Sequence, residues 1–225
     1  MEIIAGIHKI EGVRGANCYL VALGTELLLI DTGMPGNGNK IINYVKGLGK
    51  NASDIKYVFL THADIDHIGS AAKIKQMTGA QLVIHVNDAP ILAGKSRMKT
   101  IKGPLGLIMK LILGFMRFHP VEPDVVVKED TDIAGFKVIH TPGHTNGSIS
   151  LYQPGKVIFV GDALKSDSRG NLNFPSRLLS ADIVKATVSI MAIAELEFDC
   201  LLPGHGAPVK GDASLKVKNL LKTLG

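Results

Sequence analysis

The sequence predicts an α/β fold of two β-sheets with helices on their outer faces. Three observations support this class: short apolar runs that recur along the chain, helical patterns between groups of those runs, and glycine at many turns. The chain has 225 residues, of which 46% are hydrophobic and 25 are glycine, so it can bury a sizeable core. We therefore expect residues 1–225 to form a single domain.

The first half of the chain reads as strands interspersed with helices. In order, it predicts strands over 17–21 and 26–30, a helix over 39–48, a strand over 55–60, a helix over 68–77 and a strand over 81–86. The predicted strands are rich in leucine, β-branched and aromatic residues, as strands of half-buried sheets are.

The second half resembles a repeat of this scheme. It predicts strands over 125–127, 136–140, 149–152 and 157–160, a helix over 181–196 and a strand over 200–202. Strands that are grouped in this way and flanked by helices are typical of two sheets with helices outside them.

The strongest functional pattern is the segment Thr61–Ser70 (THADIDHIGS), which follows a predicted strand. In an extended loop, residues i and i+2 project to the same side, so His62 and Asp64 can share one cation. Asp66 and His67 are adjacent and project differently, so they reach more naturally towards a second cation. Such a cluster is costly to bury unless a cation holds it. The segment therefore predicts a metal site.

Other polar residues also follow predicted strands and have glycine neighbours. They are Asp31, His144, Asp162 and His205. Two cations beside the cluster need further ligands, which His144, His205 and a bridging carboxylate from Asp162 can supply. Histidine and carboxylate ligands suit zinc, iron or manganese. A paired site of this kind lowers the pKa of a bridging water towards ~7, which generates hydroxide at neutral pH.

Five segments now resemble, in order, the signature elements of the metallo-β-lactamase superfamily. They are Asp31, THADIDHIGS, TPGHTNGS, VGDA and PGHG, and they extend over nearly the whole chain. The resemblance implies an αββα sandwich of two mixed β-sheets flanked by helices, with a dinuclear metal site at one edge of the sheets.

The resemblance also implies a role for each residue of the site. It assigns His62, Asp64 and His144 to one metal, Asp66, His67 and His205 to the other, and a bridging position to Asp162. Asp31 is expected to support the loops of the site by hydrogen bonding. Asp66 is the expected catalytic residue, which contacts both a metal and the attacking hydroxide.

Asp64 departs from the usual superfamily pattern, His-x-His-x-Asp-His, because it stands where the second histidine is expected. An acidic residue at this position is similar to the His-x-Glu-x-Asp-His pattern of flavodiiron proteins. A hard oxygen ligand shifts metal preference from zinc towards iron or manganese. We expect two divalent metal ions, with zinc first and iron or manganese as alternatives.

The expected function is a metal-dependent hydrolase that uses a metal-bridging hydroxide on a small ester, thioester or lactone. Two alternatives remain: a non-haem diiron oxidoreductase similar to the flavodiiron core, and a phosphodiesterase or nuclease of the same superfamily. Lys165 and Arg169 follow Asp162 and are candidates for binding a substrate carboxylate or an oxyanion.

The segment over about 90–120 is an apolar and basic insertion, which predicts either a lid over the metal site or a dimer contact. It contains six basic residues and no acidic one, so the rest of the chain has a formal net charge of −1 and the net charge of +5 belongs to this segment. We therefore expect no nucleic-acid partner. Its apolar run is too interrupted to span a membrane. The two cysteines, Cys18 and Cys200, and a start without a signal-peptide pattern predict a cytoplasmic protein.

Overall fold

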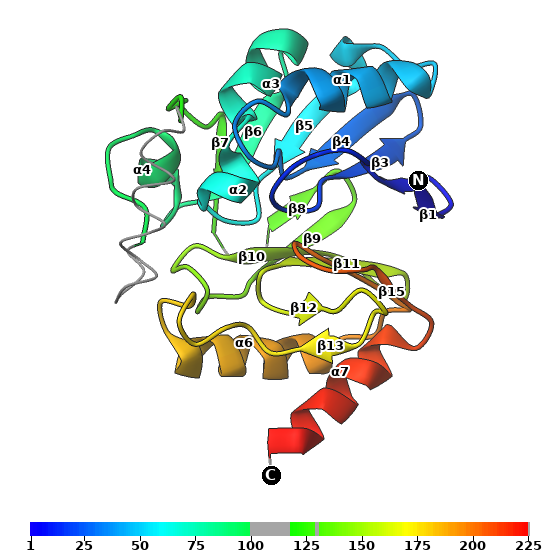
Figure 1. Cartoon of the computed structure of the whole chain (residues 1–225), viewed down its shortest axis with the longest axis vertical. Helices are drawn as coiled ribbons and strands as arrows, with labels where there is room; N and C mark the ends of the chain where they lie inside the picture. The colour runs from blue at the N-terminus through cyan, green and yellow to red at the C-terminus, as the bar shows by residue number, and fades with distance from the viewer. Residues whose placement is uncertain (100–117, 129–130, 225) are drawn as a thin grey trace. The chain divides into compact units, whose positions relative to one another are not determined.

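A computed structural model describes residues 1–99, 118–128 and 131–224 of the chain (Figure 1). The chain forms two compact units, Met1–Val126 and Val127–Gly225. Each unit is built on one mixed β-sheet that is covered by helices. The organisation into one domain stays a prediction.

The sheet of the first unit contains seven strands, which lie in the order in which they occur in the chain. They are β1 (Glu2–Ile4), β2 (Ile7–Lys9), β3 (Tyr19–Leu23), β4 (Glu26–Ile30), β5 (Ile55–Phe59), β6 (Gln81–His85) and β7 (Val125–Val127). The strands from β1 to β4 pair antiparallel, whereas β5 is parallel to both β4 and β6. Parallel pairing brings the carboxyl ends of β4, β5 and β6 to one edge of the sheet.

The helices of the first unit follow its parallel strands. They are α1 (Gly38–Gly47), η1 (Ala52–Asp54), α2 (Ile65–Ile68), α3 (Ala71–Thr78) and α4 (Ala89–Leu92). In Figure 1, α1 and α3 cover the same face of the sheet. They bury Ile41, Val45 and Ile74 in one core cluster with strand residues such as Leu29 and Val58. Burial of these side chains stabilises the sheet, and the polar segments lie at one edge of it.

The second unit contains a sheet of six strands in the order β15-β14-β11-β10-β9-β8 and a separate two-stranded ladder. The six are β8 (Thr131–Ile133), β9 (Phe136–His140), β10 (Ile149–Gln153), β11 (Val157–Gly161), β14 (Cys200–Pro203) and β15 (Val209–Lys210); the ladder joins β12 (Lys165–Ser166) and β13 (Leu172–Asn173). Among the described residues of this unit, β11 and β14 are the pair that is parallel, so their carboxyl ends share one edge.

The helices of the second unit are α6 (Ile183–Ala194), α7 (Ala213–Leu221) and the short η2 (Lys222–Leu224). Asp182 caps α6, since its carboxylate accepts hydrogen bonds from the backbone N–H groups of Val184 and Lys185, both at 3.0 Å. The helix packs Ile190 and Ile193 into the core of this unit.

Most predicted elements lie where the sequence places them. The strands over 26–30, 125–127 and 136–140 have the predicted bounds. The helix expected over 68–77 is observed as α3 over Ala71–Thr78, and Ile68 instead ends the separate short helix α2, with Gly69 following it. At Gly69 the chain lies against Pro35, and a Cβ atom would collide with that ring. The sequence pattern did not indicate this contact.

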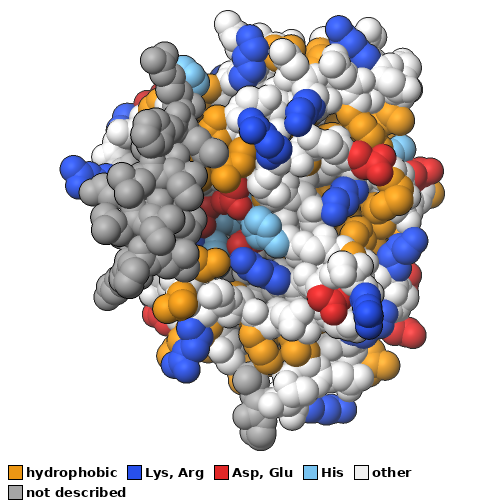
Figure 2. All heavy atoms as spheres, in the orientation of Figure 1, with side chains coloured by type: hydrophobic (Ala, Val, Ile, Leu, Met, Phe, Trp, Pro, Cys, Tyr) orange, Lys and Arg blue, Asp and Glu red, His pale blue; other side chains and the backbone are white. Residues whose placement is uncertain are grey.

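The candidate lid or dimer contact over about 90–120 lies largely outside the described residues, which include only 90–99 and 118–120 of it. In the described parts of the chain, no helix combines the length and the apolar character that a membrane span requires. On the face drawn in Figure 2, Lys and Arg side chains are scattered rather than gathered in one patch.

Candidate metal centre

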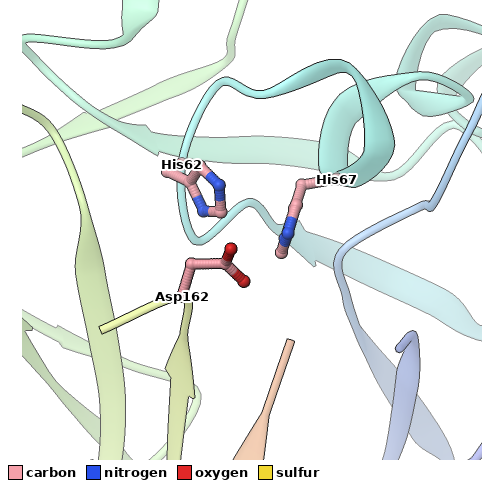
Figure 3. Close-up of side chains that lie close together, drawn as sticks. All are labelled: His62, His67 and Asp162. Carbon is pink, nitrogen blue, oxygen red and sulfur yellow. The ribbon is translucent and has the colours of Figure 1, made fainter. Parts of the chain in front are cut away.

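The histidine–aspartate cluster of the first unit occupies the loop after β5 and the short helix α2. His62 and His67 are fully buried, whereas Asp64 and Asp66 are partly exposed. The rings of the two histidines lie next to each other, with centroids 3.9 Å apart and planes inclined by 49° (Figure 3). The parallel strand β5 thus places two imidazoles together at the edge of its sheet.

Asp31 anchors this cluster from the end of the neighbouring strand β4. Its Oδ2 lies 2.7 Å from Nδ1 of His67, and it accepts a hydrogen bond of 2.8 Å from the Thr61 hydroxyl. Its Oδ1 accepts the backbone N–H of Thr61 at 2.9 Å. The φ of Asp31 is 58°, a left-handed conformation that is costly for a residue other than glycine. The strained backbone aims a buried carboxylate at the cluster.

This network also determines which nitrogen of each histidine carries a proton. The carboxylate of Asp31 can only accept, so the proton in its hydrogen bond with His67 is on Nδ1. The Thr61 hydroxyl donates to Asp31, so it accepts from Nδ1 of His62, which lies 3.1 Å away. In the neutral form of each imidazole, the lone pair is then on Nε2, which is the form that binds a metal.

Asp64 is held by a lysine that the sequence did not single out. Nζ of Lys99 lies 2.7 Å from Oδ2 of Asp64, and the same oxygen lies 3.5 Å from Nε2 of His62. Lys99 belongs to the basic run before residue 100, and its contact with Asp64 joins residues 35 positions apart in the sequence.

Asp88 is a second residue that sequence reasoning missed. Its buried carboxylate accepts the backbone N–H of Ala63 at 2.7 Å, so it holds the middle of the cluster loop in place. An aspartate shortly after a strand is ordinary turn chemistry, and no local pattern distinguishes one that reaches a loop 25 residues away.

In the second unit, Asp162 follows β11 and is the centre of a group of polar side chains. Nε2 of His144 lies 3.5 Å from its Oδ2, and Nε2 of His205 lies 3.5 Å from its Oδ1. Asp162 and His144 are buried, whereas the side chain of His205 is 33% exposed. The carboxylate of Asp162 stands at the end of its strand (Figure 3). Two imidazoles thus approach one carboxylate from opposite oxygens.

Close approaches of the backbone explain the glycines beside these two histidines. Gly143 has φ of 134°, and a Cβ atom there would collide with the backbone of Ala186 at the start of α6. Gly206 has φ of 99°, and a Cβ atom would collide with the backbone of Ser166. Only glycine permits both the positive φ and the close approach, so these turns position His144 and His205.

The predicted substrate-binding residues occupy different surroundings. Nζ of Lys165 lies 3.1 Å from Oδ2 of Asp162. Arg169 is exposed, and its backbone N–H donates to Asp167 at 2.7 Å in a turn. The Asn171 amide donates to the same carboxylate, and this hydrogen bond is the main cause that lowers the pKa of Asp167. The polar stretch after Asp162 therefore organises its own loop around Asp167.

The donor set fits a divalent metal of the zinc, iron or manganese kind. The residues that offer a ligand atom are His62, Asp64, Asp66, His67, His144, Asp162 and His205, each with an imidazole nitrogen or a carboxylate oxygen. Thiolate ligation does not fit, because burial raises the pKa of Cys18 well above its usual value and that of Cys200 to about 11. Both cysteines are free and buried.

Comparisons with known proteins agree with this chemistry. The model of the metallo-β-lactamase superfamily matches residues 12–205. "Probable metallo-hydrolase YflN" of Bacillus subtilis is 32% identical, over 92% of this chain and 88% of its own length. "Probable metallo-hydrolase MJ0888" of Methanocaldococcus jannaschii is 27% identical, over 89% of this chain and 92% of its own length.

Solved structures share the fold. The di-iron-bound form of TTHA1623 is 25% identical with a TM-score of 0.70, and the alignment covers 90% of this chain and 93% of that one. A β-lactamase from Chitinophaga pinensis is 22% identical with a TM-score of 0.72, over 97% and 88% of the two chains. The predicted metallo-β-lactamase-like α/β fold class is thereby confirmed. By its family match and by its similarity to these relatives, the chain belongs to the metallo-β-lactamase superfamily, a superfamily of metallo-hydrolases.

Proposed function

We propose that this chain is a hydrolase that binds two divalent cations and cleaves a small ester, thioester or lactone. The proposed ligands are His62, Asp64 and His144 for one cation, Asp66, His67 and His205 for the other, and Asp162 as the bridging carboxylate. Membership of the superfamily and the names of the two relatives support the hydrolytic chemistry.

The observation that carries the proposal is the buried hydrogen-bond network from Asp31 to the two histidines. Metal-binding histidines generally donate their second ring N–H to a carboxylate or another acceptor, which fixes the tautomer and raises the basicity of the ligand nitrogen. His67 donates directly to Asp31, and His62 donates through the Thr61 hydroxyl. Two buried histidines with only a structural role would not need a shared carboxylate partner, Asp31, in a costly left-handed backbone conformation.

The chemistry divides between the cations and the side chains. When bound, divalent cations of this kind lower the pKa of a water molecule towards ~7 and polarise the carbonyl oxygen of the substrate. The Asp66 carboxylate is partly exposed, and we assign to it the orientation of the attacking water and acceptance of its proton.

Substrate binding is assigned to the second unit. Lys165 is 21% exposed beside Asp162, so its ammonium is placed to donate to an oxyanion or a substrate carboxylate; Arg169 lies farther along the same polar loop. On the face drawn in Figure 2, the Lys and Arg side chains of the described residues form no single patch, which supports a small-molecule substrate over a nucleic acid. Within the superfamily fold, loops rather than the metal site select the substrate.

Iron chemistry is the second candidate, and one observation favours it. TTHA1623, which is similar to 90% of this chain, has been solved in a di-iron-bound form. The oxygen ligand that Asp64 offers also suits iron or manganese. An oxidoreductase similar to the flavodiiron core needs a separate electron donor, whereas a hydrolase needs only water.

Metal analysis and a substrate panel separate these candidates. The full chain is purified without added metal, its metal content is measured, and thioesters, lactones, carboxylic esters and a phosphodiester are offered to it. Hydrolysis of an acyl substrate that is lost on chelation and restored by zinc supports the proposal. Two irons with an oxo-bridge absorption band and no acyl hydrolysis support the redox candidate. Cleavage of the phosphodiester alone supports the nuclease alternative and contradicts the acyl specificity.

A further inference from the structure

The ion pair between Asp64 and Lys99 gives the cluster a feature that the superfamily pattern does not contain. Nζ of Lys99 lies 2.7 Å from Oδ2 of Asp64, and this oxygen is the one that lies 3.5 Å from Nε2 of His62. The side chains of Lys99 and Asp64 are 19% and 18% exposed, so water screens the pair only in part. A positive charge therefore already stands at the oxygen that faces the histidine.

The substitution of histidine by Asp64 makes this ion pair possible. A neutral imidazole that binds a metal does not attract an ammonium group, whereas a carboxylate does. Asp64 and Lys99 together carry the same net charge as the neutral histidine of the usual pattern. Lys99 thus removes the extra negative charge that Asp64 brings to the cluster.

The same ion pair opposes metal binding at this position. A zinc, iron or manganese ion binds a carboxylate oxygen at about 2.0–2.2 Å and an imidazole nitrogen at about the same distance. A divalent cation between Asp64 and His62 would therefore stand close to the Lys99 ammonium and repel it. Lys99 must leave Asp64 before the cation can bind both residues.

We propose that Lys99 is a built-in competitor for the cation at Asp64 and His62, which makes the two metal positions unequal in affinity. This inference rests on the proposed metal centre. Asp64 is a proposed ligand of one cation only, so Lys99 weakens that position and not the one that uses Asp66 and His67. The lysine acts as a positioning residue, since it affects the cation through Asp64.

The test is a calorimetric titration of the metal-free full chain with zinc and, separately, with manganese. For the wild type we expect two binding steps that differ by at least about tenfold in affinity. Lys99→Met removes the charge and keeps the length of the side chain, so the weaker step should strengthen by at least about tenfold while the stronger step stays unchanged. Lys99→Arg keeps the charge and should leave the affinity of the weaker binding step as low as in the wild type.

Lys95→Met is the matched control. Lys95 lies in the same stretch and forms an ion pair of 2.7 Å with Glu122, but both side chains are largely exposed and neither is a proposed ligand. This variant loses the same charge and should leave both steps unchanged. Two binding steps of equal affinity in the wild type would overturn this inference but not the proposed metal centre. The same holds if Lys99→Met leaves the affinity of the weaker step unchanged. A wild type that binds no metal in either titration would overturn the proposed metal centre itself.

Discussion

The two units hold their candidate ligands in different ways. In the first unit, four ligands come from one stretch of six residues, and buried hydrogen bonds from Asp31, Thr61 and Asp88 orient that stretch. In the second unit, His144, Asp162 and His205 come from three separate strand ends. Sheet topology and tight glycine turns bring them together.

This difference indicates what each half of the site depends on. The first cluster depends on side-chain hydrogen bonds, so replacing a single polar atom should weaken its ligands without unfolding the unit. The second cluster depends on backbone geometry, so a single added methyl group at a turn should disturb both the fold and the ligands.

The largest effect is expected for Asp66→Asn. The amide cannot accept the proton of the attacking water, so hydrolysis should fall by about 10²–10⁴-fold or become undetectable. Circular dichroism should show an intact fold. Glu26→Gln, an exposed change on β4 in the same unit, is the control and should keep full activity. Turnover of Asp66→Asn equal to that of the wild type would show that the mechanism is wrong.

Gly143→Ala tests the dependence of the second unit on its backbone. The new methyl group would collide with the backbone of Ala186 and must also accept a φ of 134°, so we expect a loss of about 2–3 kcal/mol in the free energy of unfolding. Gly155→Ala is the matched control, because Gly155 has φ of 68° but nothing lies near the new methyl group. Denaturant unfolding should show a clearly smaller loss for Gly155→Ala; equal losses would contradict the role of the close approach.

Asp31→Asn tests the side-chain network of the first unit. The amide keeps the shape but not the charge that holds the Nδ1 proton of His67, so metal affinity should fall by about 10–100-fold. Calorimetric metal titration measures this loss, and thermal unfolding without metal should change far less. If thermal stability without metal falls strongly while the metal affinity of the folded protein is unchanged, the hydrogen-bond network of Asp31 has only a structural role.

Thr61→Val should give the smallest effect. It removes the hydroxyl that links Nδ1 of His62 to Asp31 but leaves the direct bond from Asp31 to His67. We expect metal affinity to fall by less than for Asp31→Asn, by up to about tenfold. Thr61→Ser keeps the hydroxyl and should bind metal like the wild type. If Thr61→Ser loses as much metal affinity as Thr61→Val, the proposed hydrogen-bond link from His62 to Asp31 through the Thr61 hydroxyl is excluded.

The sequence predicted the parts of the fold that have local patterns. Leucine-rich and β-branched runs identified strands such as 26–30 and 136–140, because their burial is visible in the composition of a short window. It did not predict β1, β2, β8, β12, β13 and β15, which have only two or three residues each. Such short strands exist because of their neighbours in the sheet and leave no periodic pattern.

The candidate ligands were predictable for a related reason. Their spacing within 61–70 and their position after strands are local properties, and the superfamily resemblance supplied the rest. Asp88 and Lys99 were missed because their roles depend on contacts with residues 25 and 35 positions away. A hydrogen bond or an ion pair over that distance is decided by tertiary structure, which the sequence pattern does not display.

The central claim is that ligands from both units bind metal. The most direct test is the metal content of the full chain after saturation with zinc and removal of unbound metal, for the wild type, His67→Ala and His205→Ala. We expect up to two equivalents of zinc per wild-type chain and a loss of zinc in both His67→Ala and His205→Ala, each of which changes one unit. A wild-type chain without stoichiometric metal, or variants that retain the wild-type content, would contradict it.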